Sequence, residues 1–300
     1  MFTACAHHSR DNKSLRIKKF LSSLSQEEHL ALSHFFRTLI QEDAAGYVLL
    51  GEKPLCFYSY LKPLPVVKPF SSAQNNVQLF FEGFESREIL FHHGWEIWKK
   101  RGSQFYGKNI VFDCIDWIDD LHWMQILVIN KNLILQTFKS HFEQFKKLDF
   151  SASTPELLVD SFLCNLSLKN DFFANHELLG IALGYGEKNA RKFQTMCEIL
   201  HKMGKLGFTI NQPSSNNIAK LQREYESIHN SLSFLEDHQS HKFLFTLGVG
   251  CRVDFSDAES VFLEKKYRKL RKLLTQEYRQ ADFLTKTLEL IVSANEPILK

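Results

Sequence analysis

The chain has 300 residues, of which 44% are hydrophobic and 24% charged, and this globular composition excludes extensive disorder. Its 37 basic and 34 acidic side chains leave a net charge of only +3, too balanced for a protein whose whole surface binds nucleic acid. No apolar run reaches the roughly 18 residues that a transmembrane helix needs. The first residues also lack the apolar segment of a secretory signal.

The N-terminal segment is expected to pass from a polar tail into a helix. Residues 1–13 are mostly polar and indicate the tail. Between Ser25 and about Gln41, apolar side chains recur every three or four positions, which is helical spacing. Glu28 follows Ser25 by three positions, and this arrangement predicts a capping box at the start of the helix.

Two short apolar runs follow, 46–51 and 55–61, and they predict a β-hairpin with Gly51 in its turn. The other elements expected in this half are a helix over 86–100 and strands over 109–115 and 123–130. The acidic stretch between these two strands indicates a connecting turn.

A boundary is expected at residues 147–154, where the helical pattern stops. Thr154 and Pro155 fit the N-cap and the first position of a new helix. Ser256 and Glu259 predict a capping box for the last helix. Beyond the boundary the predicted helices are 155–166, 172–183, 187–203, 215–236 and 257–292, with one β-rich run over 242–255.

These elements predict the fold class α+β. A small antiparallel sheet belongs to the N-terminal half, the C-terminal half is predominantly helical, and the chain ends in a long helix. The corresponding division is a mixed region over 14–150 and a mostly helical region over 151–300. The sequence leaves open whether the two regions form one domain.

The cysteines are scattered along the chain and form no CxxC pair, which predicts reduced thiols in a reducing compartment. A Cys–His pair that meets only in the fold stays an open alternative. The six positions are Cys5, Cys56, Cys114, Cys164, Cys197 and Cys251.

Two clusters contain metal-ligating residue types, but neither has a known ligand spacing. The first lacks the glycine and terminal glutamate of an EF-hand, and the second is not HExxH. No metal or cofactor is therefore predicted. The clusters are Asp113, Asp116, Asp119, Asp120 and His122, and Glu88, His92, His93 and Glu96.

Glycines and cations come together in HELLGIALGYGEKNARKF (176–193). Gly184 and Gly186 precede a helix that carries Lys188 and Arg191, and glycines in such a place can expose N–H groups to an anion. The spacing matches neither a Walker nor a Rossmann motif, both of which follow a strand. The favoured interpretation is a helix end with Gly184 at positive φ.

A basic run, KKYRKLRK, lies in the last predicted helix. Such a run can contact phosphates, acidic proteins or anionic lipid, or it can be a solvated helix face. No aromatic platform accompanies it, so nucleic acid is an unlikely partner. Its cations are Lys265, Lys266, Arg268, Lys269, Arg271 and Lys272.

The last two predicted helices repeat apolar residues at alternating spacings of three and four, which is a coiled-coil pattern. The favoured interpretation is that the two helices pack on each other within the monomer. The alternative is that the seam takes a partner helix. The seam positions are Ile218, Leu221, Tyr225, Ile228, Leu232 and Leu235, and then Leu263, Tyr267, Leu270, Leu274, Ala281, Leu284, Leu288 and Ile291.

Two blocks, FFRTLIQEDAAGYVLLGEKPLCFYSYL (35–61) and HELLGIALGYGEKNARKF (176–193), resemble segments of an uncharacterised protein family of obligate intracellular bacteria. The resemblance implies a bacterial protein of a host-dependent lifestyle and carries no activity, cofactor or site residue with it. It favours a location in the bacterial cytoplasm and leaves delivery into the host open.

The leading functional hypothesis is a non-enzymatic interaction protein that binds a partner protein through its C-terminal helices. The alternative is a hydrolase or transferase with a site assembled from dispersed Cys, His and Asp residues. The sequence indicates no oligomeric state.

Overall fold

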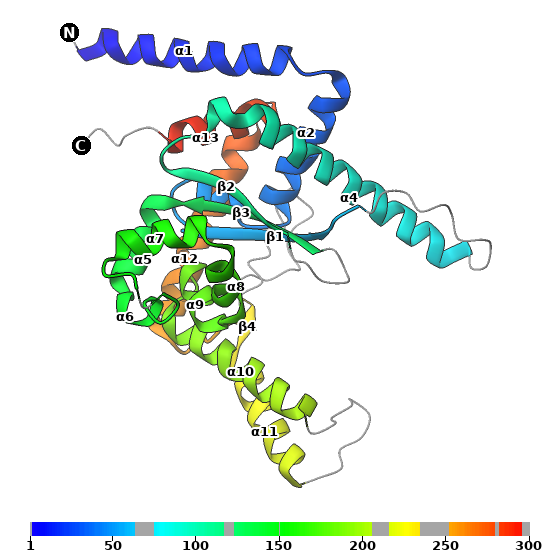
Figure 1. Cartoon of the computed structure of the whole chain (residues 1–300), viewed down its shortest axis with the longest axis vertical. Helices are drawn as coiled ribbons and strands as arrows, with labels where there is room; N and C mark the ends of the chain where they lie inside the picture. The colour runs from blue at the N-terminus through cyan, green and yellow to red at the C-terminus, as the bar shows by residue number, and fades with distance from the viewer. Residues whose placement is uncertain are drawn as a thin grey trace.

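We describe a computed structural model of the chain, in which residues 2–63, 75–116, 123–149, 151–205, 216–234, 252–279 and 282–295 are placed. A small sheet stands at the centre with helices on both of its faces (Figure 1). This arrangement confirms the predicted α+β fold class, with the sheet in the N-terminal half and helices dominating the C-terminal half.

The sheet is antiparallel and has the order β1-β3-β2. Its central strand pairs with both neighbours, so that Ile126 lies opposite Tyr58 on one side and Cys114 on the other. All three strands were predicted from their apolar runs. They are β1 (Leu55–Leu61), β2 (Ile110–Asp116) and β3 (Trp123–Asn130).

Helices from both ends of the chain cover one face of the sheet and bury the larger, first core. Phe36 packs edge to face on Phe35 and on Trp98 in this core, with the ring centroids 5.0 Å apart in each of these two pairs. The N-terminal elements on this face are α1 (Phe2–Ser22), α2 (Gln26–Gln41), α3 (Ala45–Leu49), α4 (Asn75–Arg101) and the 3-10 helix η1 (Gly102–Phe105).

The opposite face of the sheet carries the second core, in which Phe138, Phe145, Phe162 and Phe172 pack against one another. Leu127 and Ile129 of β3 contribute from the sheet. The helices of this layer are α5 (Lys131–Ser140), α6 (Phe142–Phe145), α7 (Pro155–Cys164), α8 (Leu166–Ala174) and α9 (His176–Ala182).

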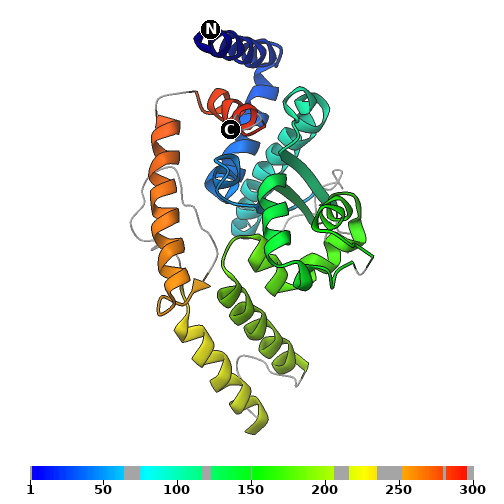
Figure 2. The same cartoon turned by 90° about the vertical axis from the view of Figure 1, so that its left-hand side faces the viewer.

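The remaining elements leave the second layer and return to the first core. α10 (Glu187–Lys205) and α11 (Asn216–Ser231) extend away from the body side by side, and α12 (Ala258–Arg279) runs back along its flank (Figures 1 and 2). α13 (Phe283–Ala294) closes the first core. The short strands β4 (Ser233–Phe234) and β5 (Arg252–Val253) pair with each other.

The helix starts predicted from local motifs are confirmed. The backbone N–H of Glu28 donates to Ser25 Oγ at 3.1 Å, and the Glu28 carboxylate accepts from Ser25 N at 2.9 Å, which completes the capping box. Thr154 caps α7 by accepting from Leu157 N at 3.3 Å, and Pro155 takes the first helical position.

Two predictions in the N-terminal half are wrong. Residues 2–22 form α1, where a tail was expected over 1–13, and the buried Ile17 and Phe20 anchor this helix in the first core. The run 46–51 lies in α3 and its C-terminal cap, so no hairpin joins it to β1. A short apolar run fits a buried helix as well as a strand, and periodicity alone does not separate them.

The predicted final helix over 257–292 divides into α12 and α13, and Asp282 starts the second one by accepting from Thr285 N at 2.9 Å. The predicted capping box at Ser256 is also wrong, because Ser256 N and Oγ both donate to Asp254 Oδ1. Most of the predicted β-rich run 242–255 lies outside the described residues.

The apolar seam of α12 is buried in the first core and does not pack on α11, which lies against α10. Leu274 is 0% exposed, and its δ carbons lie 3.0 and 3.1 Å from the position that a Cβ on Gly46 would occupy. The two seams therefore do not form the hairpin that we favoured. The division at residue 150 does not separate two cores, because α12 and α13 complete the core of the N-terminal half.

This burial predicts a large difference between two adjacent leucines. Leu274→Asp places an unpaired charge in the first core and should lower the free energy of unfolding by about 4 kcal/mol or more. Leu273→Asp changes a side chain that is 42% exposed and should cost less than about 1 kcal/mol. Urea unfolding of both variants measures the difference, and equal stabilities would contradict the buried seam.

Candidate functional site

The predicted glycine turn is a helix end of the Schellman type. Gly184 has φ of 75°, as predicted, and its N–H donates to Ile181 O at 2.9 Å. Tyr185 N donates to Gly180 O at 3.0 Å. These two bonds satisfy the last carbonyls of α9 and turn the chain directly into α10.

The end of α3 has the same geometry. Gly51 has φ of 74°, its N–H donates to Val48 O at 3.0 Å, and Glu52 N donates to Tyr47 O at 3.0 Å. The positive φ at Gly51 therefore serves a helix end, whereas the sequence suggested a hairpin turn.

The chain segments that leave these two helix ends meet at α12. Lys53 Nζ lies over the Tyr185 ring at 4.4 Å and near the Tyr267 ring of α12 at 5.9 Å. Lys53 is only 1% exposed, so its charge has little access to water and is held over aromatic faces. We name this contact of three segments the junction.

An open cleft of about 470 Å³ lies beside the junction. It brings together Gly184, Gly186 and Lys188 of the predicted anion turn with Lys266 of the basic run, which lie far apart in the sequence. The ionisable groups of its wall are Glu52, Glu187, Glu259, His141, Lys188 and Lys266.

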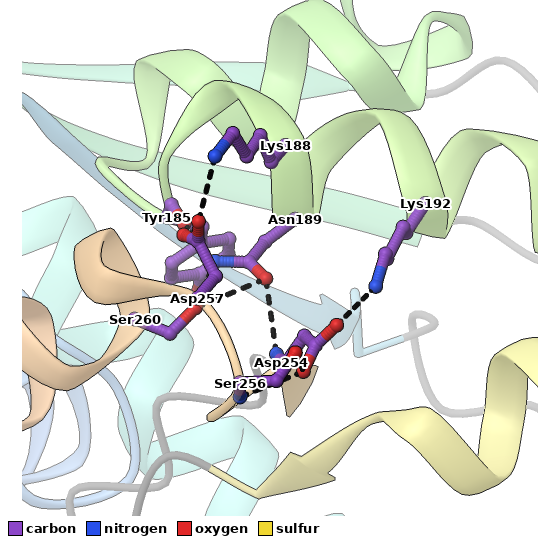
Figure 3. A network of polar contacts seen from close by, with 8 residues as sticks. All are labelled: Tyr185, Lys188, Asn189, Lys192, Asp254, Ser256, Asp257 and Ser260. Carbon is purple, nitrogen blue, oxygen red and sulfur yellow. Dashed lines mark hydrogen bonds and ion pairs between the residues drawn. The ribbon is translucent and has the colours of Figure 1, made fainter.

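The cations of the turn have carboxylate partners (Figure 3). Lys188 Nζ lies 2.7 Å from Asp257 Oδ1, and Lys192 pairs with Asp254, whose pKa this ion pair lowers. Arg191 contacts Glu187 at 2.6 Å and also pairs with Glu177. These cations join α10 to the segment before α12 and to α9.

A carboxylate lies where an anion would approach the glycines. A Cβ at Gly186 would come within 2.5 Å of the Glu259 carboxyl carbon. Burial, followed by the charge of Asp257, raises the pKa of Glu259. With three glutamates in the wall and its lysines paired, the cleft does not favour phosphate, and the geometry of Gly184 supports the helix-end interpretation.

A buried polar pair that the sequence did not reveal joins α10 to α12 (Figure 3). Asn189 Nδ2 donates to Ser260 Oγ at 3.0 Å and to Tyr185 O at 3.0 Å, and Asn189 Oδ1 accepts from Asp254 N at 3.1 Å. Asn189 is 2% exposed and Ser260 0%. Both are common polar residues and they lie 71 positions apart, so no local sequence pattern indicates the pair.

The basic run divides between the fold and the solvent. Lys266 Nζ donates to Glu52 O at 2.8 Å and lies 3.3 Å from Glu52 Oε2. Arg268 pairs with Glu264, and burial raises the pKa of the Tyr47 hydroxyl while the nearby charge of Arg271 opposes that rise. These three cations therefore serve intramolecular contacts.

The other three lysines are exposed on one side of α12, with one exposed apolar side chain before them and one after them along the helix. Phe262 is 64% exposed and Leu273 is 42% exposed, about three turns further along the helix. We name this surface the outer face. It consists of Phe262, Lys265, Lys269, Lys272 and Leu273.

The acidic cluster of β2 is used for structure. Lys169, which is 5% exposed, places Nζ 2.5 Å from Asp113 Oδ2 and 2.9 Å from Leu163 O, and Lys62 pairs with Asp116 at 3.0 Å. Asp119, Asp120 and His122 lie outside the described residues. Within the described ranges, no three His, Cys, Asp or Glu side chains are arranged to hold a metal ion.

The histidine cluster of α4 is likewise dispersed. His92 Nδ1 shares a hydrogen bond of 2.8 Å with the Tyr60 hydroxyl, and burial lowers the pKa of His92. His93 lies 3.9 Å from Glu27, and Glu96 pairs with Lys99 at 2.7 Å.

The side chains of four cysteines are described, Cys56, Cys114, Cys164 and Cys197, and all four are free thiols, in line with the predicted reduced state. Burial raises the pKa of Cys56, Cys114 and Cys197. A raised pKa keeps these sulfurs protonated and is the opposite of what activates a nucleophile.

Comparisons with family models, with curated proteins and with solved structures find no match to this chain. Among the described residues, no helix has the length and apolar character needed to cross a membrane.

The glycine turn predicts opposite effects for one substitution at two glycines. Gly184→Ala should lower the free energy of unfolding by about 1–2 kcal/mol, because the left-handed conformation strains an L residue. Gly204→Ala, inside α10 with open space around it, should be neutral or stabilising by up to about 1 kcal/mol. Thermal melts of both variants test this, and a Gly184→Ala protein as stable as the parent would contradict the assignment.

Asp43 predicts a pH dependence of stability. Its Oδ2 is shielded from solvent, and burial raises its pKa from 3.8 to about 7, opposed by the N–H of Ala44 and the charge of Lys53. At a pH between these two pKa values, Asp43 keeps its proton in the native state but has lost it in the unfolded chain. The free energy of unfolding therefore falls as pH rises from about 4 to about 7.

Asp43→Asn should reduce this slope, measured by urea unfolding across the same pH range. Burial also raises the pKa of Glu88 to about 7, so Glu88 keeps part of the pH dependence of stability in the variant. The control is Asp160→Asn, which changes an exposed aspartate and should leave the slope as it is. A slope that Asp43→Asn does not change would assign the pH dependence to other groups.

Proposed function

We propose that this protein is a non-enzymatic interaction protein and that the outer face of α12 binds an acidic surface of a partner protein. The observation that carries the proposal is that Lys265, Lys269 and Lys272 are all exposed on one side of α12, with the exposed Phe262 at the N-terminal end of the group. The seam on the opposite side of α12 is buried, so the partner surface differs from the apolar seam that the sequence suggested.

The charge of the outer face is not cancelled by the acids of its own helix. Of the three carboxylates of α12, Glu264 pairs with Arg268, Glu277 pairs with Lys286 of α13, and Glu259 lies against Gly186 in the cleft beside the junction. An acidic partner surface supplies the complementary charge and increases the association rate, while an apolar pocket for Phe262 supplies affinity.

The same geometry favours a protein as the partner of the outer face over a membrane or a nucleic acid. A helix that lies in a membrane interface inserts its apolar face, and the apolar face of α12 packs in the first core. The chain as a whole has a net charge of +3, which provides little long-range attraction for a nucleic acid.

The resemblance of residues 35–61 and 176–193 to proteins of obligate intracellular bacteria supports the bacterial cytoplasm as the place of this interaction. The alternative function, a hydrolase or transferase with dispersed Cys, His and Asp residues, has less support. Its candidate thiols have raised pKa values, and its Asp113 is held by Lys169.

Fluorescein-labelled poly-L-glutamate serves as a probe for the proposed acidic surface, with binding followed by fluorescence anisotropy. Replacing Lys265, Lys269 and Lys272 by Gln should weaken binding at least roughly ten-fold at low salt and flatten its salt dependence, since three charged contacts are lost. The melting temperature should stay the same, because all three lysines are exposed.

The matched control replaces three exposed lysines elsewhere, Lys18, Lys100 and Lys147, and has the same net charge as the test variant. It should bind the probe like the parent. Equal loss in both variants would show that net charge, not the outer face, attracts the probe. Tighter binding of the parent to phosphatidylserine vesicles or duplex DNA than to poly-L-glutamate would contradict a protein partner.

A further inference from the structure

A second cavity, of about 720 Å³, lies between α1, η1 and the end of α13, away from the junction and the outer face. α1 passes over α13 at this end of the molecule (Figures 1 and 2). Its lining comes from α1, with Asn12, Lys13 and Arg16, from the segment Gln104–Gly107, and from Asn295 after α13.

The floor of the cavity is fixed by one asparagine. Asn295 Oδ1 accepts from Asn109 N at 3.1 Å and from Ile110 N at 2.7 Å, while its Nδ2 donates to Phe105 O at 3.2 Å. Asn295 thus ties the end of α13 to η1 and to the start of β2. The backbone that forms this side of the cavity is therefore held in place before any ligand arrives.

Gly107 lets the two segments approach this closely. A Cβ at this position would lie 2.1 Å from Asn295 Cγ, a distance that no side chain permits.

Aromatic rings and a guanidinium form the other side. The Arg16 guanidinium lies 5.3 Å from the centroid of the Phe105 ring, which is 2% exposed and stacks on Trp98. The cation–π contact orients Arg16 while its side chain stays exposed. The Tyr106 ring, 43% exposed, adds an apolar surface at the mouth.

The charged side chains of this wall have one sign. Lys13 and Arg16, on successive turns of α1, are both cationic, and no carboxylate belongs to the described residues that line the cavity. The side-chain amides of Asn12 and Gln104 add hydrogen-bond donors. The junction cleft differs in this respect, because three glutamates line it.

The wall of the cavity is positively charged, its floor is held in place and one side is aromatic. From these features we infer that the cavity binds a small organic oxyanion, that is, a phosphate or carboxylate group on an aromatic or apolar body. Arginine presents a planar fork of N–H donors that fits either group. The volume lies within the range of small-molecule sites. The inference is independent of the proposed partner surface on α12.

The test uses phenyl phosphate and benzoate as anionic probes and phenol as the neutral match, with binding to the full chain measured by titration calorimetry. Both anions should bind saturably below about 10 mM, and phenol at least ten-fold more weakly. Arg16→Gln should weaken anion binding at least ten-fold. Gln104→Glu, which adds a carboxylate to the wall without altering α1, should do the same.

Lys18→Gln is the control, because Lys18 is exposed on the same helix but does not line the cavity. It should leave binding unchanged, and melting curves of all three variants should match the parent. Three results would overturn the inference: no saturable binding of either anion, phenol binding as tightly as the anions, or an equal loss in Lys18→Gln and Arg16→Gln.

Discussion

A buried lysine is the constraint around which the C-terminal half of this protein is arranged. Lys53 follows the cap of α3, the residue is 1% exposed, and its ammonium nitrogen is shielded from solvent. A cation in such a place is costly unless other groups offset the loss of water. Tyr185 and Tyr267 supply aromatic faces from two distant parts of the chain. Lys53, in the loop before β1, therefore contacts both the turn between α9 and α10 and the helix α12.

The sequence predicted those parts of the fold that depend on neighbouring residues. The cap at Ser25, the Thr154–Pro155 helix start and the positive φ of Gly184 were all recognisable, because each involves residues within a few positions of one another. The strands were also recognisable from their apolar runs. The errors arose where the same local signal fits two structures. The run 46–51 is short and apolar, and only its burial beneath α12 decides for a helix.

The candidate site was predictable only in part, because its parts are joined by the tertiary fold. The basic run was visible, but which of its cations face solvent depends on which side of α12 is buried in the first core. The contacts on that side come from distant parts of the chain, and Glu52 lies 214 positions from Lys266, which donates to it. The Asn189–Ser260 pair involves two residues of common types with no pattern around them. The cavity beneath α1 was missed because residues 1–13 read as a tail, although the apolar Ile17 and Phe20 gave a signal that a helix there is anchored.

The first core draws its side chains from both ends of the chain, with α1 to α4 on one side and α12 and α13 on the other, while the second core lies between them in sequence. During synthesis the ribosome therefore releases α2 and α4 long before the helices that cover them. The second core has all of its segments by α10 and can form while the first still exposes Phe and Trp side chains. Such an order prolongs the exposure of apolar surface. Until the C-terminal helices have emerged, the Phe and Trp side chains of the first core lack the cover that α12 and α13 give them in the folded chain.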